Sequence, residues 1–279
     1  MGNATRLPVV KSYITRDMGT DIEHRGLFNE QAQLYQKYRP HYPEALFDTL
    51  AAQAHLTPGS RLIEIGPGTG QATIPMAQRS YKIIAVELGK ELADATQQEL
   101  SGFGNVQVIN ESFEDVELPD NAFDLIYAAT AFHWVKPEVK YAKPHRLLRS
   151  TGHLAVIQTC HVSDGHGDHF FYASQPIYDK YLPPKEENAQ SLPTIEDLKP
   201  TADLDTKLFQ LVHFGCFPVV IDYSSTQYTN LLRTYSPQLS MEPTKREAFM
   251  DEIKELINTK FGGKLTKRYA MSLTVAKKM

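Results

Sequence analysis

The stretch Arg61 to Gly70, RLIEIGPGTG, decides the fold, because an apolar strand pattern runs directly into a glycine-rich turn. The short β-branched run 62–65 predicts a buried strand rather than a helix. The glycines that follow allow positive φ angles and a close approach of a ligand to the backbone, and they stand at Gly66, Gly68 and Gly70. Residues 71–79 are predicted to open a helix whose N-terminus offers free N–H groups. The stretch therefore predicts a nucleotide-binding turn.

The spacing of the glycines indicates which kind of nucleotide. A dinucleotide-binding turn reads G-x-G-x-x-G, whereas this turn reads G-x-G-x-G and has Gln71 where the last glycine would stand. A second predicted strand, 82–86, ends at Glu87, 21 residues after Gly66. This is the separation expected for an acidic residue that binds ribose hydroxyls. The pattern predicts a bound ribose and argues against a pyrophosphate.

Glu64, Gly66, Gly68 and Gly70 match the first motif, (E/D)-x-G-x-G-x-G, of the class I S-adenosylmethionine-dependent methyltransferases, and the chain resembles that family. The resemblance implies S-adenosyl-L-methionine as the cofactor. It also implies an α/β fold over residues 28–279, with a Rossmann-like seven-stranded sheet of order 3-2-1-4-5-7-6 flanked by helices. The last strand of that sheet is antiparallel.

Residues before the glycine turn carry a second part of the resemblance. Residues 1–27 have no clear period and are interpreted as an N-terminal arm. The segment Y-x-x-x-R-P-x-Y-P, formed by Tyr35, Arg39, Pro40, Tyr42 and Pro43, is similar to small-molecule methyltransferases of the trans-aconitate and type 11 groups. The similarity implies that 28–60 is a helical lid, with Tyr35 and Arg39 at the methionine end of the cofactor and Arg39 pairing with its carboxylate. The alternative for Arg39 is a surface arginine that caps a helix.

The remaining cofactor residues are expected after the second, third and fourth strands. Glu87 and Leu88 follow the second strand, and Thr130 ends the fourth strand, 122–130. After the third strand, 106–110, the resemblance implies that Ser112 and Phe113 receive the adenine, although Phe113 also suits a plain core position.

Beyond the fourth strand, the segment A-x-H-W matches Ala131, His133 and Trp134. Because ligands bind at the carboxyl ends of strands in open α/β sheets, Phe132 and Trp134 are expected in the substrate pocket. His133 is the candidate general base, since its ordinary pKa is near neutrality; the alternative is a histidine that packs or orients the cofactor.

An irregular segment separates the predicted fifth strand, 153–158, from the sixth, 211–223. The resemblance implies that residues 159–210 are an insertion that covers the substrate. The segment holds three histidines spaced H-x₄-H-x₂-H (His161, His166 and His169), which matches no zinc signature, so no metal is predicted. Residues 137–148 are expected to form one helix, kinked or restarted at Pro144. A last strand is expected over 265–276.

Composition narrows the functional classes. The 279 residues carry a net charge of −4 and a pI of about 6.2, which argues against nucleic acid or an anionic membrane as a partner. Two cysteines and no apolar leader predict a cytoplasmic protein. The expected oligomeric state is a monomer or a homodimer.

Three functional interpretations follow. The first is methyl transfer from S-adenosylmethionine to a small-molecule carboxylate, hydroxyl or amine by in-line displacement, mainly through alignment of the reactants. The second is an NAD-dependent oxidoreductase, which Gln71 disfavours. The third is a cofactor-binding protein without methyl transfer, or an RNA-directed methyltransferase. The sequence does not show which molecule accepts the methyl group.

Overall fold

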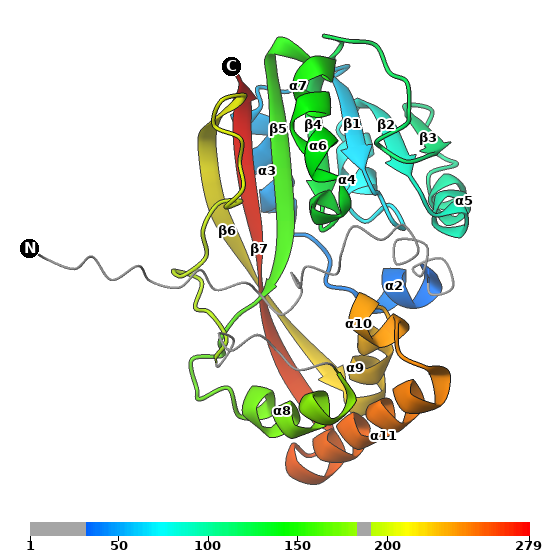
Figure 1. Cartoon of the computed structure of the whole chain (residues 1–279), viewed down its shortest axis with the longest axis vertical. Helices are drawn as coiled ribbons and strands as arrows, with labels where there is room; N and C mark the ends of the chain where they lie inside the picture. The colour runs from blue at the N-terminus through cyan, green and yellow to red at the C-terminus, as the bar shows by residue number, and fades with distance from the viewer. Residues whose placement is uncertain (1–31, 183–190) are drawn as a thin grey trace, which may run out of the picture.

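The computed structural model describes residues 32–182 and 191–279, which build one seven-stranded sheet with helices on both faces (Figure 1). The strand order is β3-β2-β1-β4-β5-β7-β6. Strand β7 runs antiparallel to both of its neighbours, β5 and β6, while β1 to β5 are mutually parallel. The predicted fold class is therefore confirmed. The predicted arm, 1–27, lies outside the described residues.

The elements follow one another in the alternating order typical of an α/β chain. In chain order they are α2 (Ala32–Tyr38), α3 (Glu44–Gln53), β1 (Arg61–Ile65), α4 (Thr73–Gln78), β2 (Lys82–Glu87), α5 (Lys90–Glu99), β3 (Val106–Asn110), β4 (Phe123–Ala129), the 3-10 turn η2 (Phe132–Trp134), α6 (Pro137–Lys140), α7 (Ala142–Leu147), β5 (Leu148–His161), α8 (His169–Tyr181), β6 (Phe209–Ser224), α9 (Ser225–Leu232), α10 (Ser236–Leu239), α11 (Pro243–Lys260) and β7 (Lys264–Lys278).

The core has two layers because successive strand residues point to opposite faces of the sheet. Leu62 and Leu125 pack with helix α3 on one face, whereas Ile63 and Ile126 pack with helix α7 on the other. All four side chains are fully buried. This burial on both faces explains why the central strands read as nearly continuous apolar runs.

Strands β5, β6 and β7 extend well beyond the rest of the sheet. They contain 14, 16 and 15 residues, whereas β1 to β4 contain five to seven. The extended part carries α8, α9 and α11 in the lower half of Figure 1. The predicted strands 153–158 and 211–223 were too short, because β5 and β6 both pair with β7 through polar residues beyond those bounds. The register of β6 with β7 shifts once, between Leu211 and His213. Pro218 lies on the edge strand β6, where a missing N–H is tolerated.

The predicted insertion, 159–210, is shorter in the structure. Strand β5 continues through His161 and β6 begins at Phe209, so the connection covers 162–208. Its helix α8 packs against α11 at the end of the molecule remote from α4 and α5 (Figure 1). Helix α2 contacts both α5 and α9, and so joins the two halves of the molecule.

Residues 137–148 form two short helices instead of one. The helix is interrupted at Tyr141, between α6 and α7. Pro144 therefore lies in the first turn of α7, where the backbone N–H that proline lacks would have no partner within the helix. Lys143 of the same helix is buried and donates from Nζ to the carbonyl oxygens of Glu114 and Val116 at 3.0 and 2.7 Å. The basic side chains of this segment are therefore not all exposed to solvent.

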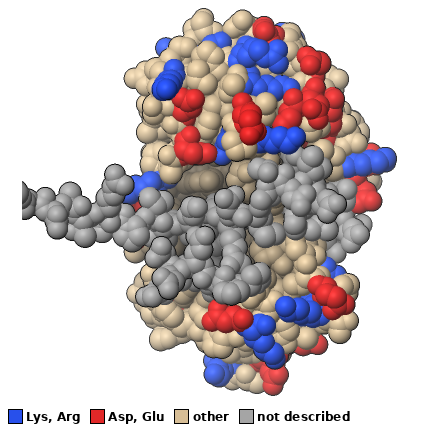
Figure 2. Space-filling model, viewed as in Figure 1, with Lys and Arg blue, Asp and Glu red and all other residues tan. Residues whose placement is uncertain are grey.

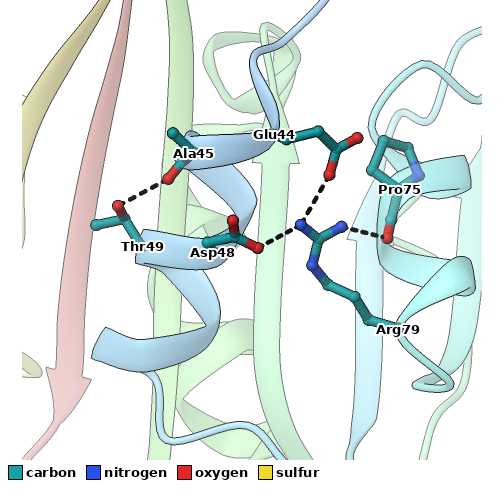
Figure 3. A network of polar contacts seen from close by, with 6 residues as sticks. All are labelled: Glu44, Ala45, Asp48, Thr49, Pro75 and Arg79. Carbon is teal, nitrogen blue, oxygen red and sulfur yellow. Dashed lines mark hydrogen bonds and ion pairs between the residues drawn. The ribbon is translucent and has the colours of Figure 1, made fainter.

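A polar network fixes α3 against the end of α4 (Figure 3). Arg79 donates from Nη2 to the carboxylates of Glu44 and Asp48 at 2.8 and 2.5 Å, and from Nη1 to the carbonyl oxygen of Pro75 at 2.8 Å. Because the carboxylates are largely exposed, solvent screens these ion pairs, and they orient the helices more than they stabilise them.

In the described part of the chain, every helix is too short or too polar to cross a lipid bilayer.

Candidate functional site

The glycine turn after β1 adopts a backbone that other residues rarely accept. Gly66, Gly68 and Gly70 have φ angles of +64°, +62° and +83°. A Cβ atom on Gly66 would lie 2.7 Å from the Cβ atom of Ala131, closer than two carbon atoms can approach. The N–H of Gly66 donates to the carbonyl oxygen of Val86 at 2.9 Å, which holds the turn against β2. The turn therefore depends on glycine both for its conformation and for its packing.

Glu87, the last residue of β2, lies directly beside the turn. Its Oε2 accepts the backbone N–H of Gly68 at 3.1 Å, and its Oε1 accepts the N–H of Gly89 at 2.9 Å. The side chain is 6% exposed, and burial raises the pKa of Glu87 while the backbone hydrogen bonds oppose that shift. Since each carboxylate oxygen has further lone pairs, Glu87 retains acceptor capacity toward a ligand.

A pocket opens at the carboxyl ends of β1, β2 and β4. Eight of the predicted site residues line it: Tyr35, Gly66, Gly68, Glu87, Leu88, Phe113, Thr130 and Trp134. Seven further residues line it that we did not predict as ligands: Ile65, Val86, Leu92, Glu114, Ala129, Ala131 and Val135. Two of these, Ile65 and Ala129, are the last residues of a strand, and the rule that ligands bind at carboxyl strand ends would have found them.

The residues of this pocket fit S-adenosylmethionine. A carboxylate that accepts two backbone N–H groups lies at the end of β2 and suits a ribose diol. Leu88 and Phe113 supply an apolar wall suited to an adenine ring, and the glycine turn leaves backbone free for close approach.

Six predicted site residues do not line this pocket: Arg39, Glu64, Gly70, Ser112, Phe132 and His133. Gly70 closes the turn, with its N–H bonded to the carbonyl oxygen of Pro67 at 2.9 Å. Ser112 donates from Oγ to Asp115 at 2.5 Å, and accepts the N–H of Asp115 at 3.1 Å. Both residues thus make local turn contacts.

Glu64 lies in the middle of the sheet, fully buried. The hydroxyl of Tyr127 on β4 donates to its Oε2 at 2.7 Å. Burial raises the pKa of Glu64 to about 7, despite the opposing effect of the Tyr127 hydrogen bond. Glu64 is therefore enclosed in the sheet next to the glycine turn and does not line the pocket.

Tyr35 and Arg39 are stacked at the end of α2. The Arg39 guanidinium lies 4.9 Å from the centre of the Tyr35 ring and 4.0 Å from that of Tyr235. Arg39 donates from Nε to Thr234 Oγ1 at 2.9 Å and from Nη2 to the Thr234 carbonyl oxygen at 2.8 Å. Arg39 is 8% exposed, so it is a buried residue rather than a surface cap. The Tyr35 ring also approaches Gly68, where a Cβ atom would lie 3.7 Å away.

Thr130 has a strained backbone at the pocket edge. Its φ angle is +58°, which a β-branched residue adopts only when its surroundings enforce it. Its N–H donates to the carbonyl oxygen of Ile157 at 2.8 Å, and its Oγ1 lies 3.0 Å from the hydroxyl of Tyr42. Tyr42 belongs to the motif around Arg39, but we had not named it as a site residue.

The residues after Thr130 separate into core and pocket. Phe132 is 3% exposed and packs edge-on against Tyr141 at 5.4 Å, so it is a core residue. Trp134 lines the pocket, with its ring centre 4.8 Å from that of His133. Burial, and then the charges of Lys140 and Arg39, lower the pKa of His133 to about 4. His133 is therefore a neutral imidazole at pH 7.

Within residues 32–182 and 191–279, no three His, Cys, Asp or Glu side chains come together in a way that would hold a metal ion.

Comparisons with known proteins agree with this geometry. The sequence profile of a family described as "Methyltransferase domain" matches residues 63–156. A candidate methyltransferase of Dictyostelium discoideum is 26% identical over 201 residues, which cover 70% of this chain and 73% of that protein. Three uncharacterised methyltransferases of Mycobacterium are 28% identical over 130 residues, and the match covers 51% of the length of each of these relatives.

Two solved structures have the same fold. A candidate type II methyltransferase from Anaeromyxobacter dehalogenans superposes with a TM-score of 0.57 at 18% identity, covering 86% of this chain and 97% of that one. A methyltransferase from Geobacter sulfurreducens, solved with S-adenosyl-L-homocysteine, superposes with a TM-score of 0.54 at 13% identity, covering 91% and 98%. Residues 63–156 thus carry a methyltransferase domain, and the sheet order and the glycine turn with Glu87 are like those of the class I S-adenosylmethionine-dependent methyltransferases.

Proposed function

We propose that this methyltransferase transfers the methyl group of S-adenosylmethionine to a small-molecule acceptor by in-line displacement. The observation that carries the proposal is the single pocket wall formed by the glycine turn, Glu87 and Thr130, at the carboxyl ends of three neighbouring strands. When bound, the cofactor supplies an activated sulfonium methyl group, so the protein needs mainly to align the acceptor and exclude water.

Each lining residue has a distinct task in this proposal. Glu87 accepts hydrogen bonds from the ribose hydroxyls, and Leu88 and Phe113 contact the adenine. Gly66 and Gly68 let the backbone approach the ligand. Tyr35 and Trp134 close the two sides of the pocket, which removes water from the methyl group.

His133 contributes as a neutral hydrogen-bonding group next to Trp134. With a pKa lowered to about 4, it is a weak base, and only acceptors that are already acidic would lose a proton to it. A carboxylate acceptor is deprotonated at pH 7 and needs no base. The low pKa therefore favours an acceptor that is already deprotonated at pH 7, such as a carboxylate.

Surface charge supports a small-molecule acceptor over RNA. On the face seen in Figure 2, basic and acidic side chains of the described residues are interspersed. The net charge of the whole chain is −4. A continuous basic surface would be expected for an RNA-directed enzyme. A candidate sarcosine dimethylglycine methyltransferase of Galdieria sulphuraria has the same fold, at 15% identity and a TM-score of 0.51. Its name indicates that its acceptors are small molecules. A cytoplasmic location and a monomeric or homodimeric state remain predictions.

The NAD-dependent alternative is disfavoured by Gln71. Its amide nitrogen lies 3.4 and 3.3 Å from the carbonyl oxygens of Tyr35 and Gln36, and so it ties α2 to the glycine turn. That side chain occupies the place where a dinucleotide site needs a glycine for close packing beside the pyrophosphate.

Calorimetric titration of the full chain with S-adenosylmethionine and with NAD tests the cofactor, and we expect binding of S-adenosylmethionine alone. A radiolabelled methyl-transfer screen over small acids, phenols, amines and thiols then tests the acceptor class. Binding of the cofactor without transfer to any small molecule, together with salt-sensitive transfer to RNA, would replace the proposal with the RNA-directed alternative.

A further inference from the structure

The structure buries two cations, one on β7 and one at the end of α2. Lys267 on β7 is 9% exposed and Arg39 is 8% exposed. Neither forms an ion pair with a carboxylate among the described residues. Arg39 uses two of its five N–H donors on Thr234, and no other described residue accepts from it. Lys267 makes no hydrogen bond to a described residue, and its Nζ lies 5.8 Å from the centre of the Phe170 ring.

Such an arrangement is costly for a folded protein. A charge taken out of water without a partner is strongly unfavourable, and proteins generally pair or expose their lysines. Two acidic residues, Asp168 and Asp164, lie in the neighbouring loop but are occupied locally: Asp168 Oδ1 accepts the N–H of Asp164 at 2.7 Å, and Asp164 Oδ1 accepts the N–H of His166 at 2.6 Å. Both carboxylates keep their charge and act on Lys267 electrostatically, but neither forms an ion pair or a hydrogen bond with it, so no described residue accepts from its ammonium group.

The register of β7 with β5 shows that Lys267 lies on the same face of the sheet as Thr159, which contacts the cofactor pocket. Paired residues of neighbouring strands point to the same face, and β7 pairs Met271 with Thr159 and Tyr269 with His161 on β5. Lys267 follows on that face two residues from Tyr269. At the other end, Thr159 Oγ1 lies 3.4 Å from Oγ1 of Thr130, which lines the pocket.

Further polar groups accompany the two cations along this face. His161 Nε2 lies 3.2 Å from the hydroxyl of Tyr235, the residue that stacks on Arg39. The buried hydroxyl of Tyr269 has no hydrogen-bond partner among the described residues. The charges of Lys267 and Arg39 both contribute to lowering the pKa of His161, after burial, so His161 lies within reach of both cations.

We propose that this face of the β5-β7-β6 extension, with Lys267, Arg39 and Tyr269, is the acceptor site of the methyltransferase and that it binds an anionic acceptor, a carboxylate or a phosphate. This inference rests on the proposed function and names its substrate class. Met271 lies opposite Thr159, the residue that contacts Thr130 of the cofactor pocket. Lys267 is four residues from Met271, which is roughly 13 Å along the strand. The acceptor thus carries its anionic group several bonds away from the atom that receives the methyl group.

The protonation of Lys267 is consistent with this role. Burial lowers its pKa to about 8, against the opposing charges of Asp168 and Asp164. Lys267 is accordingly still mainly cationic at pH 7 and can pair with an anion.

The test measures the melting temperature of the full chain, saturated with S-adenosyl-L-homocysteine, during titration with matched anionic and neutral probes. Succinate is compared with succinamide, benzoate with benzamide, and inorganic phosphate with sodium chloride at equal ionic strength. We expect at least one anion to give a saturable rise of about 5 °C at a hundredfold excess over its Kd, and the neutral amides to give none. The effective anion distinguishes a carboxylate site from a phosphate site.

The variant Lys267→Met should lose at least about tenfold in affinity for that anion. It should melt no lower than the parent protein without ligand, because the substitution removes an unpaired buried charge. Lys264→Met is the matched control, since Lys264 is exposed on the same strand, and it should respond like the parent.

Anions that stabilise the protein no more than sodium chloride, or that act equally on Lys267→Met, would overturn the inference. In that outcome S-adenosyl-L-homocysteine would still stabilise the parent protein. If S-adenosyl-L-homocysteine itself has no effect, the proposed function fails instead.

Discussion

Glu87 at the end of β2 accepts the backbone N–H of Gly68, in the turn after β1, at 3.1 Å. The hydrogen bond joins the two motif elements that the sequence separates by 19 positions, and it pre-orients the carboxylate before any ligand arrives. Because both residues line one pocket, a change in either should act on cofactor affinity and leave the distant helices α8 to α11 intact.

Gly68→Val should abolish measurable binding of S-adenosylmethionine. The substitution places a β-branched side chain at a φ angle of +62° and fills the space that the ligand needs. Calorimetry on the folded variant checks this, with Gly104→Val as the control, since a Cβ atom there meets nothing within 4 Å and the φ angle is not positive. Unchanged affinity in Gly68→Val would remove the glycine turn from the cofactor site.

Glu87→Ala should weaken S-adenosylmethionine by about one to two decades. Loss of a charge-assisted hydrogen bond from a buried site costs about 1.5–3 kcal/mol. Glu87→Gln keeps an acceptor for the Gly68 N–H and should lose less. Glu99→Ala, an exposed glutamate at the end of α5, serves as the control. An affinity of Glu87→Ala within twofold of the parent protein would contradict the ribose role.

The rate of methyl transfer should not depend on His133 ionisation between about pH 5.5 and 8. A histidine base with its ordinary pKa would give a rate that rises through about pH 6 to 7, but burial lowers the pKa of His133 to about 4 and moves any such rise to that pH. Single-turnover profiles of the parent protein and of His133→Ala, on the first acceptor found by the screen, check this. A limb between pH 6 and 7 that disappears in His133→Ala would restore His133 as the general base, with an expected loss of about 10²–10⁴-fold in rate.

Arg39→Met should weaken anion binding by about tenfold and leave the Kd of S-adenosyl-L-homocysteine within about twofold. This separates the acceptor role from the pairing with the cofactor carboxylate that the motif suggested. Thr234→Val is the matched control, because it removes the side-chain acceptor of Arg39 and retains the charge. A tenfold rise in the Kd of S-adenosyl-L-homocysteine in Arg39→Met, absent in Thr234→Val, would support the cofactor carboxylate instead.

Glu64→Gln should stabilise the ligand-free protein at alkaline pH. The folded pKa of Glu64 is raised from 4.5 to about 7, so the carboxyl group contributes no penalty below pH 4.5, and the native state loses stability as pH rises through 7. The difference in unfolding free energy between variant and parent should be near zero at pH 4.5 and reach about 2–3 kcal/mol at pH 8. Urea denaturation at several pH values measures it; a difference independent of pH would contradict the raised pKa.

The sheet order was predictable only through the family resemblance, whereas the core of the pocket was predictable because its determinants are local. A β-branched run followed by G-x-G-x-G specifies a strand and a turn with positive φ angles, whatever the rest of the chain does. Glu87 was predictable from its spacing, and Leu88, Phe113 and Thr130 from their places after strands. The same rule, applied to every strand end, would have added Ile65 and Ala129.

Other features depend on contacts between distant residues. The lengths of β5, β6 and β7 follow from the pairing of β7 with both β5 and β6, which tolerates polar residues that the apolar pattern excluded. The 137–148 segment divides at Tyr141, and Lys143 becomes buried because carbonyl oxygens from residues 27 and 29 positions away accept its protons.

By itself, therefore, the sequence determined the strand-turn-helix unit, the acidic residue at the end of the second strand and the family that they resemble. Only the tertiary structure decided that Glu64 and Phe132 are buried supports, that His133 is a weak base, and that Arg39 and Lys267 are cations without carboxylate partners among the described residues. How deeply a side chain is buried, and whether its charge has a partner, depends on neighbours from many distant segments. A linear sequence does not show which neighbours those are.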